Sequence, residues 1–139
     1  GIDHAGIHRK LFDSQNKSRF ELLKICLNNL HFFKNETIAL TYLMEDDLML
    51  YNYKKGDTEG FVNLPLSIKN VHFSAFFIQF EDGIKISFRS QGAFDVNLFA
   101  NNYFDGGGHK NAAGGFLNHR NMPEAIQYFS SALEKHIKE

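Results

Sequence analysis

The feature that most constrains the fold of this chain is a pair of apolar segments separated by a turn signal. Residues 71–80 form a nearly continuous apolar run, and residues 84–88 alternate strictly between apolar and polar side chains. Such alternation is typical of a half-buried strand. The Asp-Gly pair between the two segments, at Asp82-Gly83, favours a tight turn. The sequence therefore predicts a β-hairpin, and with it a sheet that contains at least one antiparallel pair.

Other segments predict further helices and strands. Over residues 16–33, apolar residues recur at steps of three and four and predict a long helix, whose apolar stripe consists of Phe20, Leu23, Leu27 and Leu30. A short helix is predicted before it, over residues 5–12. The other predicted elements are a strand over 37–43, a strand or short helix over 45–53, a helix over 58–68 that is capped by Asp57 or Thr58 and irregular at Pro65, a helix over 95–103, a strand over 112–117, and a helix over 122–138 capped by Asn121.

Because helices and strands interleave, the predicted fold class is α/β (α+β), with a small mixed β-sheet flanked by helices and preceded by an N-terminal linker helix. The length of 139 residues fits one domain with little room for a second. The boundary that the pattern suggests lies near Asn35, where the long helix gives way to the first strand. Residues 1–35 then read as a linker or the tail of a preceding domain, and residues 36–139 as the domain itself.

Composition narrows the range of functions. The formal net charge of −1 argues against a protein that coats long nucleic acids, although one or two well-placed cations are enough for a small anion. The single Cys26 lies in an apolar helical stretch and is predicted to be a buried, inert thiol. No apolar run reaches the ~18 residues of a membrane span, and the first residues lack a signal-peptide pattern, so a cytoplasmic location is expected.

The glycine-rich segment 104–115 stands apart from the rest of the chain. Three consecutive glycines, which are costly to order, are followed by His109 and Lys110. Consecutive amides without side chains can form an anion-binding nest, with the histidine as donor to a phosphate oxygen. The segment lacks the Gly-Lys-Ser/Thr of a P-loop, and Asn111 stands where a dinucleotide-binding fingerprint needs glycine. Phosphate binding and a purely structural tight turn both remain open interpretations.

Two motifs in this region resemble a known family. Gly106-Gly107-Gly108-His109, followed after two residues by Ala112-Ala113-Gly114, is similar to the signature of the DHH-associated domain, the C-terminal partner in DHH-family phosphoesterases. The strand ending in Arg89-Ser90 matches a second element, and Asp57-Thr58-Glu59-Gly60 matches a third more weakly. Within the family the chain most resembles the nano-RNase and phosphoadenosine-phosphate phosphatase branch, some of whose members are called exopolyphosphatase-related. The resemblance covers about residues 36–139.

The resemblance implies roles for individual residues. Arg89 and Ser90 would contact the phosphate or the terminal nucleotide of the substrate, and the planar fork of the arginine suits phosphate oxygens. Gly106, Gly107 and Gly108 would supply backbone contacts. His109 would bind substrate, face the metal centre and assist catalysis by stabilising the phosphoryl group. Glu59 and Lys110 are secondary candidates.

The resemblance also implies partners. Family members hold two divalent metal ions, usually manganese, in an N-terminal DHH domain that carries an Asp-His-His motif, which this sequence lacks. Residues 1–35 would be the tail of that DHH domain and the interdomain linker helix. The chain is expected to hold no metal of its own, and to bind short oligoribonucleotides, phosphoadenosine phosphate or cyclic dinucleotides without cleaving them. The DHH domain of the same protein would be its partner, and homodimer formation stays open.

Two functions outside the enzyme class compete with this expectation. One is a stand-alone module that binds single-stranded nucleic acid, against which the near-neutral charge counts. The other is an interaction domain in which the glycines form only a turn. Ligand binding that survives the loss of Arg89 and His109 would favour the latter.

Overall fold

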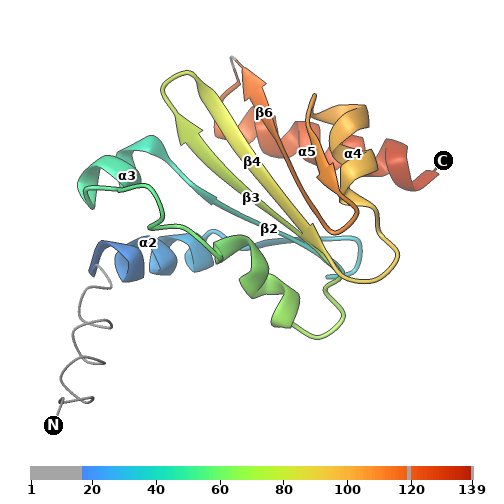
Figure 1. The fold of residues 1–139 in the computed structure, drawn as a ribbon, viewed down its shortest axis with the longest axis horizontal. Coiled ribbons are helices and arrows are strands. Elements are labelled where there is room, and N and C mark those ends of the chain that lie inside the picture. Colours follow the sequence, from blue (N-terminus) through green and yellow to red (C-terminus); the bar gives the residue numbers. More distant parts are fainter. Residues whose placement is uncertain (1–16, 119, 139) are drawn as a thin grey trace, which may run out of the picture.

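The computed structural model describes residues 17–118 and 120–138, which form one six-stranded sheet with helices on both faces (Figure 1). In spatial order the strands are β1 (His31–Phe33), β2 (Ile38–Leu43), β3 (Phe73–Phe80), β4 (Gly83–Ser90), β6 (Ala112–Asn118) and β5 (Gly107–His109). The helices are α2 (Lys17–Asn28), α3 (Glu45–Leu50), the 3₁₀ helix η1 (Phe61–Ser67), α4 (Val96–Tyr103) and α5 (Met122–Lys138). Only β2 and β3 pair in parallel among these strands, so the sheet is mixed and the predicted α/β (α+β) class is confirmed.

The hairpin at the centre of the sheet is the one that the sequence predicts. Strands β3 and β4 pair antiparallel from Phe73 opposite Ser90 to Phe80 opposite Gly83, so Glu81 and Asp82 form the connecting loop. The apolar residues of β4 alternate onto one face of the sheet. The intervening residues Lys85, Ser87 and Arg89 therefore lie on the opposite face.

A core rich in phenylalanine fills the space between the sheet and helices α4 and α5. Phe73 at its centre packs edge-on against Phe88 and Phe99, with ring centroids 5.4 and 5.5 Å apart. Phe129 of α5 contacts the same group, and all four rings are buried. Much of the phenylalanine content thus serves packing. The cap predicted for α5 is confirmed, since the Asn121 side chain accepts from the Glu124 amide at 2.9 Å and the Glu124 carboxylate accepts from the Asn121 amide at 3.1 Å. Helix α4 also has a cap, because the Asp95 carboxylate accepts from the Leu98 amide at 3.0 Å.

The other face of the sheet is covered only in part. Helices α2, α3 and η1 pack there through a second apolar cluster, whose sheet residues are Leu43 of β2 and Phe76 and Ile78 of β3. No described residue of β4, β5 or β6 belongs to this cluster. Figure 1 shows α2 and the neighbouring helical turns on this side, away from α4 and α5. Strands β6 and β5 therefore have no covering layer on this face among the described residues, and β4 is covered only in part, where η1 approaches it.

Helix α2 is shorter than predicted. It ends at Asn28, and residues 31–33, which were expected to be its last turn, form strand β1 instead. The three residues that follow, Lys34 to Glu36, all have positive φ between 54° and 63°, so the chain reverses there and β1 pairs antiparallel with β2. The sheet thereby extends across the boundary expected near Asn35.

The apolar stripe predicted for this helix is also wrong in part. Leu22 and Cys26 are the fully buried residues of α2, whereas Phe20 and Leu27 are 57% and 46% exposed. The helix contains apolar residues on more than one face, and the sheet selects the face that periodicity did not single out. Because Cys26 lies at 1% exposure in the second cluster, its prediction as a buried thiol is confirmed.

The segment after α3 also differs from its prediction. The ambiguous region 45–53 begins with the short helix α3, but the helix expected over 58–68 is a 3₁₀ helix that starts only at Phe61. Gly60 immediately before it has a φ of 86°, which breaks a continuous α-helix. The Asp57 carboxylate, an expected helix cap, accepts instead from the Lys54 amide at 2.9 Å and closes the preceding turn.

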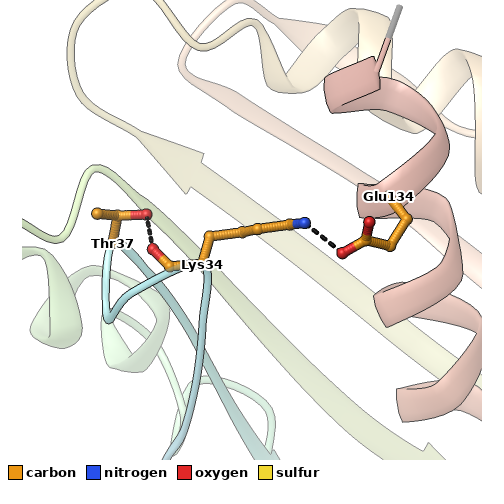
Figure 2. A network of polar contacts seen from close by, with 3 residues as sticks. All are labelled: Lys34, Thr37 and Glu134. Atoms are coloured by element: carbon orange, nitrogen blue, oxygen red, sulfur yellow. Dashed lines mark hydrogen bonds and ion pairs between the residues drawn. The ribbon is translucent and has the colours of Figure 1, made fainter.

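An ion pair joins the turn between β1 and β2 to the last helix. Lys34, in the turn between β1 and β2, contacts the Glu134 carboxylate on α5, and the Thr37 hydroxyl donates to the Lys34 carbonyl at 2.6 Å (Figure 2). The hydrogen bond and charge of Lys34 lower the pKa of Glu134. The contact links the N-terminal turn to the last helix across the edge of the sheet.

Two further sequence expectations concern the N-terminal segment and membranes. The helix predicted over residues 5–12 lies outside the described residues. Of the helices in 17–118 and 120–138, none combines the length and the apolar character that crossing a bilayer requires.

Candidate phosphate-binding site

The strand register brings two of the predicted site residues into one row across the sheet. Arg89 of β4 lies opposite Ala112 of β6, which in turn lies opposite His109 of β5. Directly opposed residues of antiparallel strands share one face, and neighbouring strands lie about 4.8 Å apart. The backbones of Arg89 and His109 are therefore about 10 Å apart on the same face, with only a methyl group between them. Two long side chains can converge on one ligand across this gap.

This row lies on the half of the sheet face that the covering helices leave open. A cavity of about 240 Å³ is hollowed there between β4 and the loop before η1. Arg89 and Glu59, both predicted as site residues, line this cavity. Its further lining consists of Tyr53, Lys55, Gly56, Thr58, Gly60, Val62, Phe76, Ile78, Lys85 and Ser87.

The charges at the cavity favour an anion. The charged residues that line the cavity are three cations, Lys55, Lys85 and Arg89, and one carboxylate, Glu59. This excess of positive charge contrasts with the net charge of −1 of the whole chain. Among the described residues none of these three cations forms an ion pair. Concentrating unpaired cations in a concave site produces a local positive potential, whatever the overall charge.

Arg89 is held in place by the strand that carries it. The guanidinium Nη1 donates to the Phe88 carbonyl at 2.8 Å, and the side chain is half-buried. One contact of this kind leaves most of the five guanidinium N–H groups for a ligand. The arginine is therefore oriented before a ligand arrives.

Helix α2 positions the loop that forms the other wall. The Arg19 guanidinium donates to the Asp57 carbonyl at 2.9 Å and stacks over the Phe61 ring at 4.9 Å. These contacts fix the chain on both sides of Glu59. The wall of the cavity thus depends on a residue that precedes the glycine-rich motif by almost ninety positions.

Ser90, predicted beside Arg89 as a substrate contact, lies on the other face of the sheet. Its hydroxyl donates to the Phe94 carbonyl at 2.7 Å and accepts from the Asn111 side chain at 2.8 Å. It is also buried, with 7% of its surface exposed. Ser90 therefore anchors the β5–β6 turn, and its position separates it from the row that contains Arg89.

The three glycines do not form a loop. Gly107 and Gly108 belong to the edge strand β5, and Gly106 directly precedes it. A Cβ atom on Gly106 would lie 1.9 Å from the Gly114 carbonyl oxygen, so β6 leaves no space for a side chain. The amide of Gly108 donates to the Asn97 side chain at 2.8 Å, and that of Gly106 to the Ala100 carbonyl at 3.2 Å. Close packing accounts for Gly106 and Gly108, whose amides are used within the fold. The backbone contacts to substrate predicted for Gly106, Gly107 and Gly108 stay a prediction.

The hairpin turn after the glycines presents the remaining candidates. His109 ends β5, and Lys110 and Asn111 form the turn into β6. His109 and Lys110 are both exposed, on the side of the sheet edge nearest Arg89. Asn111 holds the turn through Ser90. The structure thus brings Arg89, His109 and Lys110 to one end of the open face.

Sequence reasoning missed Lys85 and Ser87. Both follow the alternation that identified the hairpin, because they occupy the odd-numbered positions between its apolar residues. The polar set at two-residue spacing that ends in Arg89 could have indicated them. Lys55 and Tyr53 had no comparable signal, since a loop brings them to the cavity.

The described residues do not fit a metal centre. In the ranges 17–118 and 120–138, no group of three or more His, Cys, Asp or Glu side chains lies together in a way that could hold a metal ion. Divalent metal ions in hydrolases need several such ligands.

Comparisons with known proteins agree with this architecture. A sequence profile described as the DHHA1 domain matches residues 36–139. An exopolyphosphatase-related protein from Bacteroides fragilis is 45% identical over 98% of this chain, with a TM-score of 0.83, and the chain spans 40% of that protein's length. A pGpG-specific phosphodiesterase, PggH from Vibrio cholerae, shares the fold with a TM-score of 0.54 at 11% sequence identity. The match covers 86% of this chain and 40% of the length of PggH. A comparison with curated proteins found no match. By its profile match over residues 36–139, the chain belongs to the DHHA1 domain family.

Proposed function

We propose that this chain is the substrate-binding domain of a phosphoesterase that hydrolyses short oligoribonucleotides or nucleotide phosphates. The observation that supports this most directly is the row of Arg89, Ala112 and His109 on the uncovered half of the sheet. A guanidinium fork and an imidazole on either side of a methyl group can hold one phosphate from two directions. The cavity beside them adds Lys55 as a further cation.

The proposal assigns hydrolysis to residues outside the described part of this chain. The Bacteroides fragilis protein is more than twice as long as the segment matched here, which leaves room for a metal-binding DHH domain in a protein of that kind. We propose that such a domain, with manganese or another divalent ion, meets the face that carries Arg89 and His109. His109 would then face the metal centre at the domain interface, and the protein would act in the cytoplasm.

Calorimetric titration of the chain with AMP tests the first part of this proposal. Replacing Arg89 with glutamine removes a charge-assisted contact, so affinity should fall roughly tenfold to a hundredfold. Lys135→Gln is the matched control, because Lys135 is an exposed cation on α5, which covers the other face of the sheet. The affinity of the Lys135→Gln variant for AMP should equal that of the unsubstituted chain.

The same titration separates the proposal from its alternative. A stand-alone module for single-stranded nucleic acid would bind long strands much more tightly than AMP and would lose affinity steeply with salt. Equal AMP affinity in the Arg89→Gln and Lys135→Gln variants would contradict a phosphate site at Arg89. Binding that is lost only in the former would support it.

A further inference from the structure

A second row of paired residues crosses the open face four positions before Arg89 along β4. Lys85 of β4 is directly opposite Phe116 of β6, so these two side chains share the face that carries Arg89 and His109. Lys85 precedes Arg89 by four positions along the strand, or about 13 Å of backbone. Ser87 lies midway between them and lines the same cavity. Two cations and a hydroxyl thus form a straight track along β4.

Phe116 has no role in either apolar core. It is half-buried, and neither cluster of packed apolar residues includes it. Its ring lies against the backbone of Gly83, where an added Cβ atom would be 2.7 Å from ring atoms Cε1 and Cζ. The ring therefore covers this glycine and is itself only half-buried, so part of it stays open to a ligand, and an aromatic ring is a surface on which a base can stack.

From this pairing we infer that Lys85 and Phe116 form a second subsite, which takes the nucleotide adjoining the one whose phosphate Arg89 binds. Lys85 contacts the second phosphate, and the base stacks on Phe116. This inference rests on the proposed function and specifies its ligand as an oligonucleotide of two or more units. AMP has one phosphate, which Arg89 takes, so it leaves none for Lys85.

The chemistry of the second row also distinguishes between classes of polyanion. A lysine attracts any phosphate, but a stacking ring contributes only when the ligand carries a base. An inorganic polyphosphate therefore gains affinity from Lys85 but none from Phe116. A dinucleotide gains affinity from both residues.

The test compares AMP, the dinucleotide pApA and tripolyphosphate by calorimetry in the unsubstituted chain, in three variants of the second row and in the control Lys135→Gln. pApA should bind about tenfold more tightly than AMP. Lys85→Gln should weaken pApA and tripolyphosphate about fivefold and reduce the salt dependence of both, while AMP stays within about twofold. Phe116→Leu should weaken pApA alone, and Phe116→Tyr, which keeps an aromatic ring over Gly83, should retain the pApA affinity.

The outcomes separate this inference from the proposed function. Equal affinities for AMP and pApA in the unsubstituted chain would overturn the second subsite and leave the Arg89 site standing. Equal weakening of AMP and pApA by Lys85→Gln would also overturn it, because Lys85 would then belong to the first phosphate. No measurable binding of any of the three ligands would overturn both, whereas Lys135→Gln should change none of the affinities.

Discussion

Cys26 illustrates how burial alone can fix the chemistry of a side chain. The thiol lies under the sheet in the second apolar cluster, where desolvation disfavours its charged form. Burial raises the pKa of Cys26 to about 11. A thiolate is therefore not available at neutral pH, and the residue contributes packing instead of reactivity.

The raised pKa makes a prediction about stability. An unfolded thiol ionises near pH 9.0 but the folded one near 11, so the stabilisation is fully present below pH 9.0 and is lost as the pH rises to 11. Between pH 7.5 and 10.5 this loss should amount to about 2 kcal/mol of unfolding free energy. Urea unfolding of the unsubstituted chain and of Cys26→Ala measures it, because lysine and tyrosine titrations are common to both. Identical pH dependence in the two proteins would contradict the account.

At the scale of elements, the glycine tract is a packing device between α4, β5 and β6. Asn97 of α4 accepts from the Gly108 amide and is itself fixed by the Asn101 side chain at 3.1 Å. The helix can approach the edge strand this closely because Gly107 and Gly108 carry no side chains, and a Cβ atom on Gly107 would lie 3.2 Å from the Asn97 side-chain oxygen. The tract thereby holds His109 at a defined distance from Arg89.

Replacing Gly106 with alanine tests this role. The added methyl group would overlap the Gly114 carbonyl, so unfolding free energy should fall by roughly 2–3 kcal/mol. Gly92→Ala is the matched control, because no atom lies within 4 Å of its added methyl group and only its φ of 76° disfavours alanine, at a cost of about 1 kcal/mol. Urea unfolding of both variants gives the comparison. A Gly106→Ala variant no less stable than Gly92→Ala would show that the strands have room to separate.

How far the sequence predicts each element depends on whether its signal is local. The hairpin, α4 and α5 are predicted within a few residues because alternation, caps and turn residues lie inside each segment. Strand β1 was assigned to a helix, because its three residues become a strand only through pairing with β2. The glycine tract looked like a loop for the same reason, since its partner strand lies later in the chain.

At the scale of the whole molecule, the sheet divides into a covered half and an open half. The helices on the α2 side cover β2 and β3, while β4, β6 and β5 present Arg89, His109, Lys85 and Phe116. The sequence indicated Arg89 and His109 through a family resemblance, but not that they share a row. Pairing register, which only the folded sheet supplies, creates that row and places Ser90 on the opposite face.

The most direct test of this account is to map where a nucleotide binds. Amide chemical shifts of the chain, recorded by NMR during titration with pApA, report contacts residue by residue in a protein of 16.0 kDa. The predicted changes lie on β4, β6 and the His109 turn, with α5 and the outer side of α2 unchanged. Shifts confined to α5 or α2, with none along β4, would contradict the assignment of the open sheet face as the binding site.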